Sequence, residues 1–73
     1  MDDAVSIYRI ERVDEWVVEL KKWLSEERIS AFYFAQLPHP LNNLSMLSRA
    51  RARGYIRPIR VIAGGMKLWE VVK

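Results

Sequence analysis

Polar and cationic side chains gather in the second half of this chain, where they can hydrogen-bond to a polyanion. Residues 41–73 hold seven Lys/Arg against the single Glu70, a net charge of +6. Residues 1–40 hold five Lys/Arg against eight Asp/Glu, a net charge of −3. This asymmetry favours one face for a polyanion and another for solvent or protein. The side chains that we consider for such contacts are Ser30, Asn42, Asn43, Ser45, Ser48, Arg49, Arg51, Arg53, Arg57, Arg60 and Lys67.

The residue types available do not indicate an enzyme. His39 is the single histidine of the chain, and there is no cysteine. These residues cannot supply a metal-ligand set or a nucleophile with its base and orienting group. The sequence also lacks a glycine-rich motif of the kind that cradles phosphates. We therefore expect no catalytic activity, no metal and no cofactor.

Length and composition favour one small globular domain. The chain has 73 residues, of which 51% are hydrophobic and three are Trp. A domain of this size removes only about 60% of its surface from water on folding, so its stability is marginal or depends on a partner such as a second copy. The N-terminus does not resemble a signal peptide, and we expect a cytoplasmic protein. Abundant Arg and Glu with no Thr or Cys are typical of a thermophile.

Apolar periodicity predicts two helices in the first half of the chain. Between residues 13 and 24 the apolar side chains recur at three- and four-residue spacing, which predicts an amphipathic helix. A second helix is expected over residues 30–37, with Ser30 as its N-cap and Pro38 ending it. Residues 1–12 are expected to form an arm that includes a short strand within residues 4–10, which are rich in β-branched and aromatic side chains.

The basic half is expected to form a helix followed by a hairpin. Asn42 or Asn43 is a suitable N-cap for a helix over residues 42–53, and Gly54 suits a left-handed stop at its end. Residues 55–72 form two apolar runs joined at Gly64-Gly65, which predicts a β-hairpin. With a two-residue turn, Ala63 pairs with Met66, Val61 with Leu68 and Arg60 with Trp69. Pro58 should then lie at an edge or a bulge.

Three helices followed by a two-stranded hairpin is the order of elements in the winged helix-turn-helix superfamily. The segment LSRARARGYI, residues 47–56, resembles the end of a recognition helix that runs through Arg-Gly into the first wing strand. The resemblance covers residues 13–72 and rests on Leu47, Ala50, Gly54 and Ile56. It implies an α+β fold, a three-helix winged helix-turn-helix with a C-terminal two-stranded β-hairpin wing. The stiff connector at residues 38–40 and the short, uncharged wing tip depart from the pattern.

The resemblance implies double-stranded DNA binding by a small transcriptional regulator, plausibly a homodimer. The helix at 42–53 would enter the major groove, with Asn42 hydrogen-bonding adenine, Arg49 hydrogen-bonding guanine, and Ser45 and Ser48 contacting bases or phosphates. The amide end of the second helix at Ser30 would hold one phosphate. The remaining cations would contact phosphates, namely Arg51, Arg53, Arg57, Arg60 and Lys67.

Several alternatives remain open at the level of sequence. Asn42 and Asn43 can simply cap a helix, the arginines can be an ordinary solvated surface, and Arg60 can stack on Trp69. The same fold can serve as a protein-interaction module without direct DNA reading. Its contacts would then involve the N-terminal segment, the helix at 13–24 or the aromatic residues 32–34. RNA is a further candidate for the basic surface.

Overall fold

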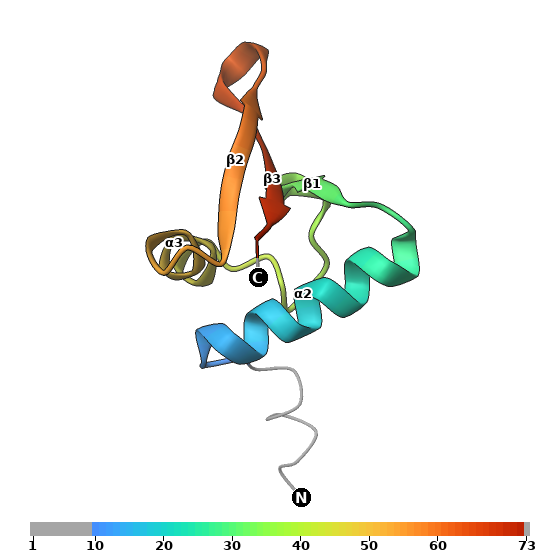
Figure 1. Cartoon of the computed structure of the whole chain (residues 1–73), viewed down its shortest axis with the longest axis vertical. Coiled ribbons are helices and arrows are strands. Elements are labelled where there is room, and N and C mark those ends of the chain that lie inside the picture. The colour runs from blue at the N-terminus through green and yellow to red at the C-terminus, as the bar shows by residue number, and fades with distance from the viewer. Residues whose placement is uncertain (1–9, 73) are drawn as a thin grey trace, which may run out of the picture.

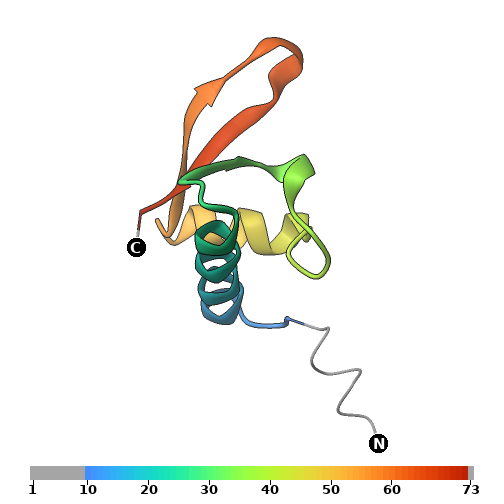
Figure 2. The ribbon, with the colours of Figure 1, turned by 90° about the vertical axis from the view of Figure 1, so that its right-hand side faces the viewer.

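The computed structural model describes residues 10–72, which form two α-helices and a three-stranded antiparallel sheet. In chain order the elements are α2 (Val13–Glu27), β1 (Ala31–Tyr33), the 3-10 turn η1 (Phe34–Gln36), α3 (Leu44–Ala52), β2 (Ile56–Val61), the 3-10 turn η2 (Ala63–Gly65) and β3 (Lys67–Val71). The strand order is β1-β3-β2, so β3 is central. The two helices lie crosswise beneath the sheet, and the β2–β3 hairpin projects beyond them (Figures 1 and 2).

The helix predicted at residues 13–24 is present and continues three residues further, to Glu27. It buries five residues at helical spacing against the sheet and α3, which are Val13, Trp16, Val17, Leu20 and Leu24. Arg28 ends it in the left-handed conformation, with a φ of 59°. The amides of Arg28 and Ile29 donate to the carbonyls of Ser25 and Leu24, so this terminus closes without a glycine.

The predicted helix at residues 30–37 is wrong, because this segment supplies the third strand of the sheet. Phe32 is completely buried and pairs with Trp69, while its neighbours Ala31 and Tyr33 are only half-buried. That alternation is the pattern of a strand with one covered face. After Tyr33 the chain makes the short turn η1, held by a 2.8 Å hydrogen bond from the Tyr33 amide to Gln36 Oε1. Ser30 therefore does not begin a helix.

The helix predicted at residues 42–53 is present as the shorter α3. Asn43 is its N-cap, and its side-chain oxygen accepts a 3.2 Å hydrogen bond from the Met46 amide. At the other end, the amides of Gly54 and Tyr55 donate to the carbonyls of Arg51 and Ala50. Gly54 has a φ of 77°, as its predicted role in a left-handed stop requires.

The predicted hairpin is present, but its register differs from the predicted one. The Ile62 amide donates to the Met66 carbonyl, so three residues close the turn instead of two. Val61 consequently pairs with Lys67 and Arg60 with Leu68. A further register shift between Pro58 and Arg60 brings Pro58 opposite Trp69. Pro58 therefore lies on an edge strand beside an irregularity, as predicted, whereas the expected pairing of Arg60 with Trp69 is wrong.

The core lies between the helices and one face of the sheet. Trp16, Leu20, Phe32 and Ile56 are its largest fully buried side chains. The Trp16 indole N–H donates a 3.0 Å hydrogen bond to the Leu41 carbonyl, and this bond fixes the turn before α3 onto α2. Among the described residues no buried side-chain nitrogen or oxygen lacks a hydrogen-bond partner.

The expected fold class is therefore corrected. Residues 10–72 form an α+β fold, but with two α-helices and a three-stranded sheet in place of three helices and a two-stranded wing. The difference arises at residues 30–37, where pairing with β3 converts an expected helix into a strand. The short strand expected within residues 4–10 falls almost entirely outside the described residues, and Ile10, the one described member, is not in a strand.

Candidate nucleic-acid interface

The exposed face of α3 is built from small side chains. Met46, Leu47 and Ala50 are buried and fix the orientation of the helix. Because successive residues of a helix are about 100° apart, the side opposite these three carries Ser45, Ser48 and Ala52, all of which are exposed. Leu44, at the edge of this face, has 61% of its surface exposed. A surface of hydroxyls and methyls allows the helix backbone to come close to another molecule.

A concave polar surface lies beside the first turn of α3. It has a volume of about 710 Å³ and includes Asn42, Asn43, Ser45 and Arg49 among its lining residues. The turn before α3 positions them, because the amides of Leu41 and Asn42 both donate to the Pro38 carbonyl. The structure thus brings four of the expected contact residues together. Asn43 is already engaged as the helix cap, which leaves the exposed Asn42 as the better candidate for an outside contact.

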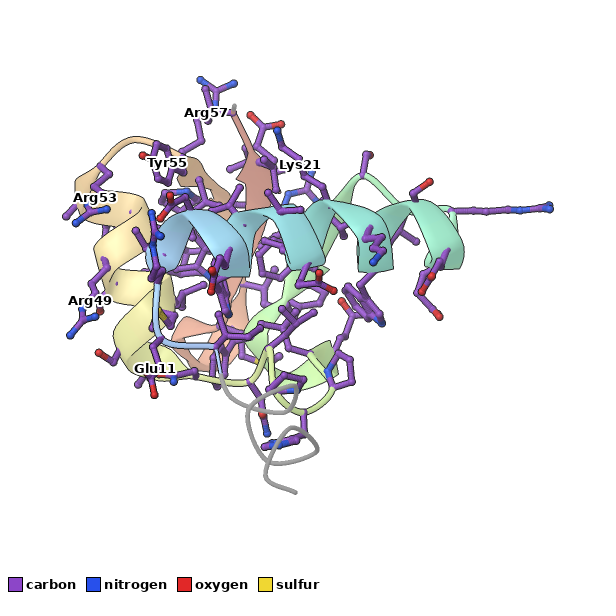
Figure 3. All side chains as sticks on the ribbon, turned by 90° about the horizontal axis from the view of Figure 1, so that it is seen from below. Glu11, Lys21, Arg49, Arg53, Tyr55 and Arg57 are labelled. Atoms are coloured by element: carbon purple, nitrogen blue, oxygen red, sulfur yellow. The ribbon has the colours of Figure 1, made fainter. Side chains whose placement is uncertain are left out.

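Arg49 and Arg53 form the flank of α3 that faces the start of α2. Both project outward from the helix, with Tyr55 beside Arg53 (Figure 3). Together with residues at the start of α2 they border a second hollow of about 400 Å³. Its lining also contains two acids: Asp14, which is paired with Arg12 at 3.1 Å, and Glu11. This flank is therefore cationic on the side of α3 and mixed in charge on the side of α2.

Arg51 occupies the other flank of α3, on the side of the sheet. Its guanidinium carbon lies 5.7 Å from the centroid of the Trp69 ring, which is the geometry of a cation–π contact. The guanidinium edges can still donate hydrogen bonds, because stacking uses only the flat face. Stacking of Arg60 on Trp69 was the alternative to a phosphate contact of Arg60. Arg51 takes that place because the register puts Arg60 opposite Leu68.

The cations of the hairpin are separate from those of α3. Arg57 forms an ion pair with Glu70 on the neighbouring strand, although its side chain remains 66% exposed. Arg60 and Lys67 are exposed and lie closer to the projecting tip, where they pair with Leu68 and Val61. Ser30 precedes β1 and begins no helix, so the expected phosphate site at a helix N-terminus is not formed there.

Three residues near this surface received no binding role in the sequence reasoning. His39 lines the concave surface at the start of α3, Tyr55 borders the flank of Arg49 and Arg53, and Leu44 is exposed on the helix itself. The apolar character of Leu44 was visible in the sequence, but helical periodicity placed it at the edge of the buried side. His39 and Tyr55 are brought to the surface of α3 by turns, which carry no periodic signal.

The described residues contain neither a metal-binding cluster nor a membrane-spanning helix. No group of three or more His, Cys, Asp or Glu side chains in residues 10–72 is placed to hold a metal ion. Within the same residues no helix is long and apolar enough to cross a membrane. Comparison with protein-family models, with curated proteins and with solved structures gave no match.

Proposed function

We propose that this protein binds double-stranded DNA through the exposed face of α3 and acts as a small regulator of transcription. The observation that carries the proposal is the arrangement of α3, whose small polar centre is flanked on both sides by arginines. A helix of this shape can approach the floor of a groove while its flanks reach the phosphates of either strand. From Leu44 to Val71 the chain keeps the predicted order of helix, glycine and hairpin, so α3 leads directly into the basic strands.

Charge around α3 supports the same proposal. The sequence contains no Asp or Glu from residue 28 to residue 69, so β1, α3, β2 and the tip of the hairpin are free of acids. Phosphate binding by Lys and Arg supplies most of the sequence-independent affinity for DNA. Glu11 and Asp14, at the start of α2, restrict the proposed contact to the outer side of Arg49 and Arg53.

The structure refines the role that we propose for each residue. Asn42, Ser45, Ser48 and Arg49 are the candidates for base contacts, because they surround the first turns of α3. Asn43 contributes indirectly by capping the helix. We propose phosphate contacts for the flanking cations of α3, Arg51 and Arg53, and for the separate cations of the hairpin, Arg57, Arg60 and Lys67. Of these, Arg51 must share its guanidinium with Trp69, and Arg57 must share its own with Glu70.

A salt titration of duplex binding tests the proposal. Each phosphate contact should lower the logarithm of the affinity by about 0.9 per logarithm of salt concentration, so three to five contacts predict a slope of roughly −3 to −4.5. Fluorescence anisotropy with labelled duplexes at several salt concentrations measures it. If the protein does not bind duplex DNA at low salt, or if its affinity is independent of salt, the proposal is wrong.

Two variants separate base reading from phosphate binding. Arg49→Ala should reduce discrimination between a selected duplex and a random one by about 1–3 kcal/mol, because a bidentate guanine contact is lost. Arg53→Ala should weaken binding to both duplexes alike. Lys21→Ala is the matched control, since Lys21 is an exposed cation on α2 (Figure 3). Equal losses from Lys21→Ala and Arg53→Ala would remove α3 as the binding element.

A further inference from the structure

An apolar groove lies on the side of α3 that faces the projecting hairpin. Three segments distant in sequence form it: the end of β1 with η1, the first turns of α3, and the hairpin tip with β3. Its volume is about 350 Å³, within the roughly 300–1,000 Å³ range of ligand sites. The side chains that matter most here are Phe34, Leu44, Leu47, Met66, Lys67 and Trp69.

The groove combines a fixed floor with exposed apolar walls. Leu47 and Trp69 belong to the core, with 6% and 5% of their surfaces exposed. Leu44 and Met66, by contrast, are 61% and 45% exposed. Covering these two side chains would remove apolar surface from water, which is favourable in proportion to the area covered. The groove is therefore ready to accept apolar side chains from another molecule.

Among the described residues, the charged side chains at the groove are positive. Lys67 lines it, and Arg51 lies over the ring of Trp69 at its floor. The nearest acid in sequence, Glu70, lies on the opposite face of β3, because successive side chains of a strand alternate, and it is paired there with Arg57. All residues that line the groove fall within the stretch of residues 28–69 that has no Asp or Glu. An occupant with negative charge around its apolar anchors would be complementary to it.

We propose that this groove is the docking site for an acidic protein segment whose apolar side chains insert between Leu44 and Met66. This is a function separate from DNA binding. Grooves of this kind commonly hold an amphipathic helix through apolar anchors at i, i+3, i+4 and i+7. Duplex DNA presents phosphates and sugar edges, which would leave the apolar walls uncovered. In a symmetric contact between two copies, Lys67 and Arg51 of one groove would approach the same cations of the other groove. Their repulsion disfavours a second copy as the occupant.

The test uses a synthetic amphipathic peptide with leucines at those spacings between glutamates, and a matched peptide with glutamine in place of glutamate. Binding is followed by amide and methyl chemical shifts of the isotope-labelled protein, which also show that each variant is folded. The acidic peptide should shift signals of Leu44, Leu47 and Met66 and should bind at least about tenfold more tightly than the glutamine peptide.

Met66→Ser should weaken the acidic peptide about fivefold or more, because it removes one apolar wall. Val18→Ser is the matched control, since Val18 is 60% exposed but lies on α2, and it should leave the affinity unchanged. The proposal is independent of the DNA proposal, because Arg49→Ala should leave peptide binding intact whether or not it impairs DNA binding.

Four outcomes would overturn the inference. Equal affinity for the glutamine peptide would show that charge has no part in recognition. Shifts confined to residues outside the groove would place the peptide elsewhere. If sedimentation shows self-association and Met66→Ser abolishes it, the groove belongs to a second copy of the chain. If single-stranded oligonucleotides shift the signals of the groove and the acidic peptide does not, the groove binds nucleic acid.

Discussion

Trp16 links the core of the molecule to the surface that we propose for binding. Its ring is fully buried, and its indole N–H donates to the carbonyl of Leu41, 25 residues further along the chain. Leu41 is itself buried and belongs to the turn whose amides bond to Pro38. The position of Asn42 and of the first turn of α3 therefore depends on one side chain of α2.

Replacing Trp16 by Phe should destabilise the protein by about 2–4 kcal/mol, since it removes the buried indole hydrogen bond to the Leu41 carbonyl, which then accepts only from the Asn43 amide, and opens space in the core. Urea denaturation followed by circular dichroism measures the change. Trp23→Phe is the matched control, because Trp23 is only half-buried at the rim of the core and its indole N–H donates no hydrogen bond to the described residues. It should cost about 1 kcal/mol or less. Similar losses for the two variants would show that the hydrogen bond to Leu41 is unimportant.

The residues of the candidate interface were predictable where local chemistry alone decides their role. An asparagine cap for α3 could be predicted from the Asn42-Asn43 pair, and the structure assigns the cap to Asn43. The partner of Trp69 could not be predicted, because it depends on the register of the hairpin. One additional residue in the turn moves Arg60 opposite Leu68 and leaves the ring of Trp69 to Arg51. A one-residue slip in register exchanges the two faces of a strand, so this error changes the pairing between the turn and the second register shift at Pro58.

At the scale of elements, the end of α2 shows why periodicity can underestimate a helix. Residues 25–27 are Ser, Glu and Glu, which add no apolar side chain to the buried face, and two acids are unfavourable in a last turn. The helix nevertheless continues through them, and the left-handed conformation of Arg28 lets the Ile29 amide turn back to the Leu24 carbonyl at its end. Such a conformation costs roughly 1–2 kcal/mol for a residue with a Cβ.

Glycine at position 28 should therefore stabilise the end of α2 relative to alanine. Arg28→Gly and Arg28→Ala lose the same charge, and only alanine retains the penalty for a φ of 59°. We expect Arg28→Gly to be more stable than Arg28→Ala by about 1 kcal/mol. The comparison is a pair of urea denaturation curves measured at one salt concentration. Equal stabilities, or a more stable Arg28→Ala, would mean that the left-handed residue does not limit this terminus.

The strand β1 could not be predicted from its local sequence, and the reason differs from that for the hairpin register. Phe32 pairs with Trp69, so its conformation is decided by a segment 37 residues away. Within residues 30–37 the local signals, a serine cap followed by aromatic residues and a proline stop, agree with a short helix. Their aromatic content agrees equally with a strand. The sheet offers Phe32 complete burial, and this non-local gain exceeds what a two-turn helix could provide.

At the scale of the whole molecule, stability is concentrated at one end of the hairpin. Ile56 and Trp69 belong to the core, with 1% and 5% of their surfaces exposed. Towards the tip, Val61 and Met66 are 62% and 45% exposed, and no helix covers this part of the sheet (Figure 2). Both proposed contact surfaces include this less protected region, because Arg60 and Lys67 lie there and Met66 forms a wall of the groove.

The tip of the hairpin should open without unfolding of the remaining domain. Regions with few buried apolar contacts open at a lower free energy than the core. We expect the Ile62 amide, which closes the turn at 2.9 Å from the Met66 carbonyl, to exchange with solvent at least about tenfold faster than the Trp69 amide after correction for intrinsic rates. Hydrogen exchange followed by NMR measures both. Equal protection would show that the hairpin unfolds only with the whole molecule. A partner bound in the groove should slow exchange at Ile62 more than at Trp69, because it stabilises the closed tip directly.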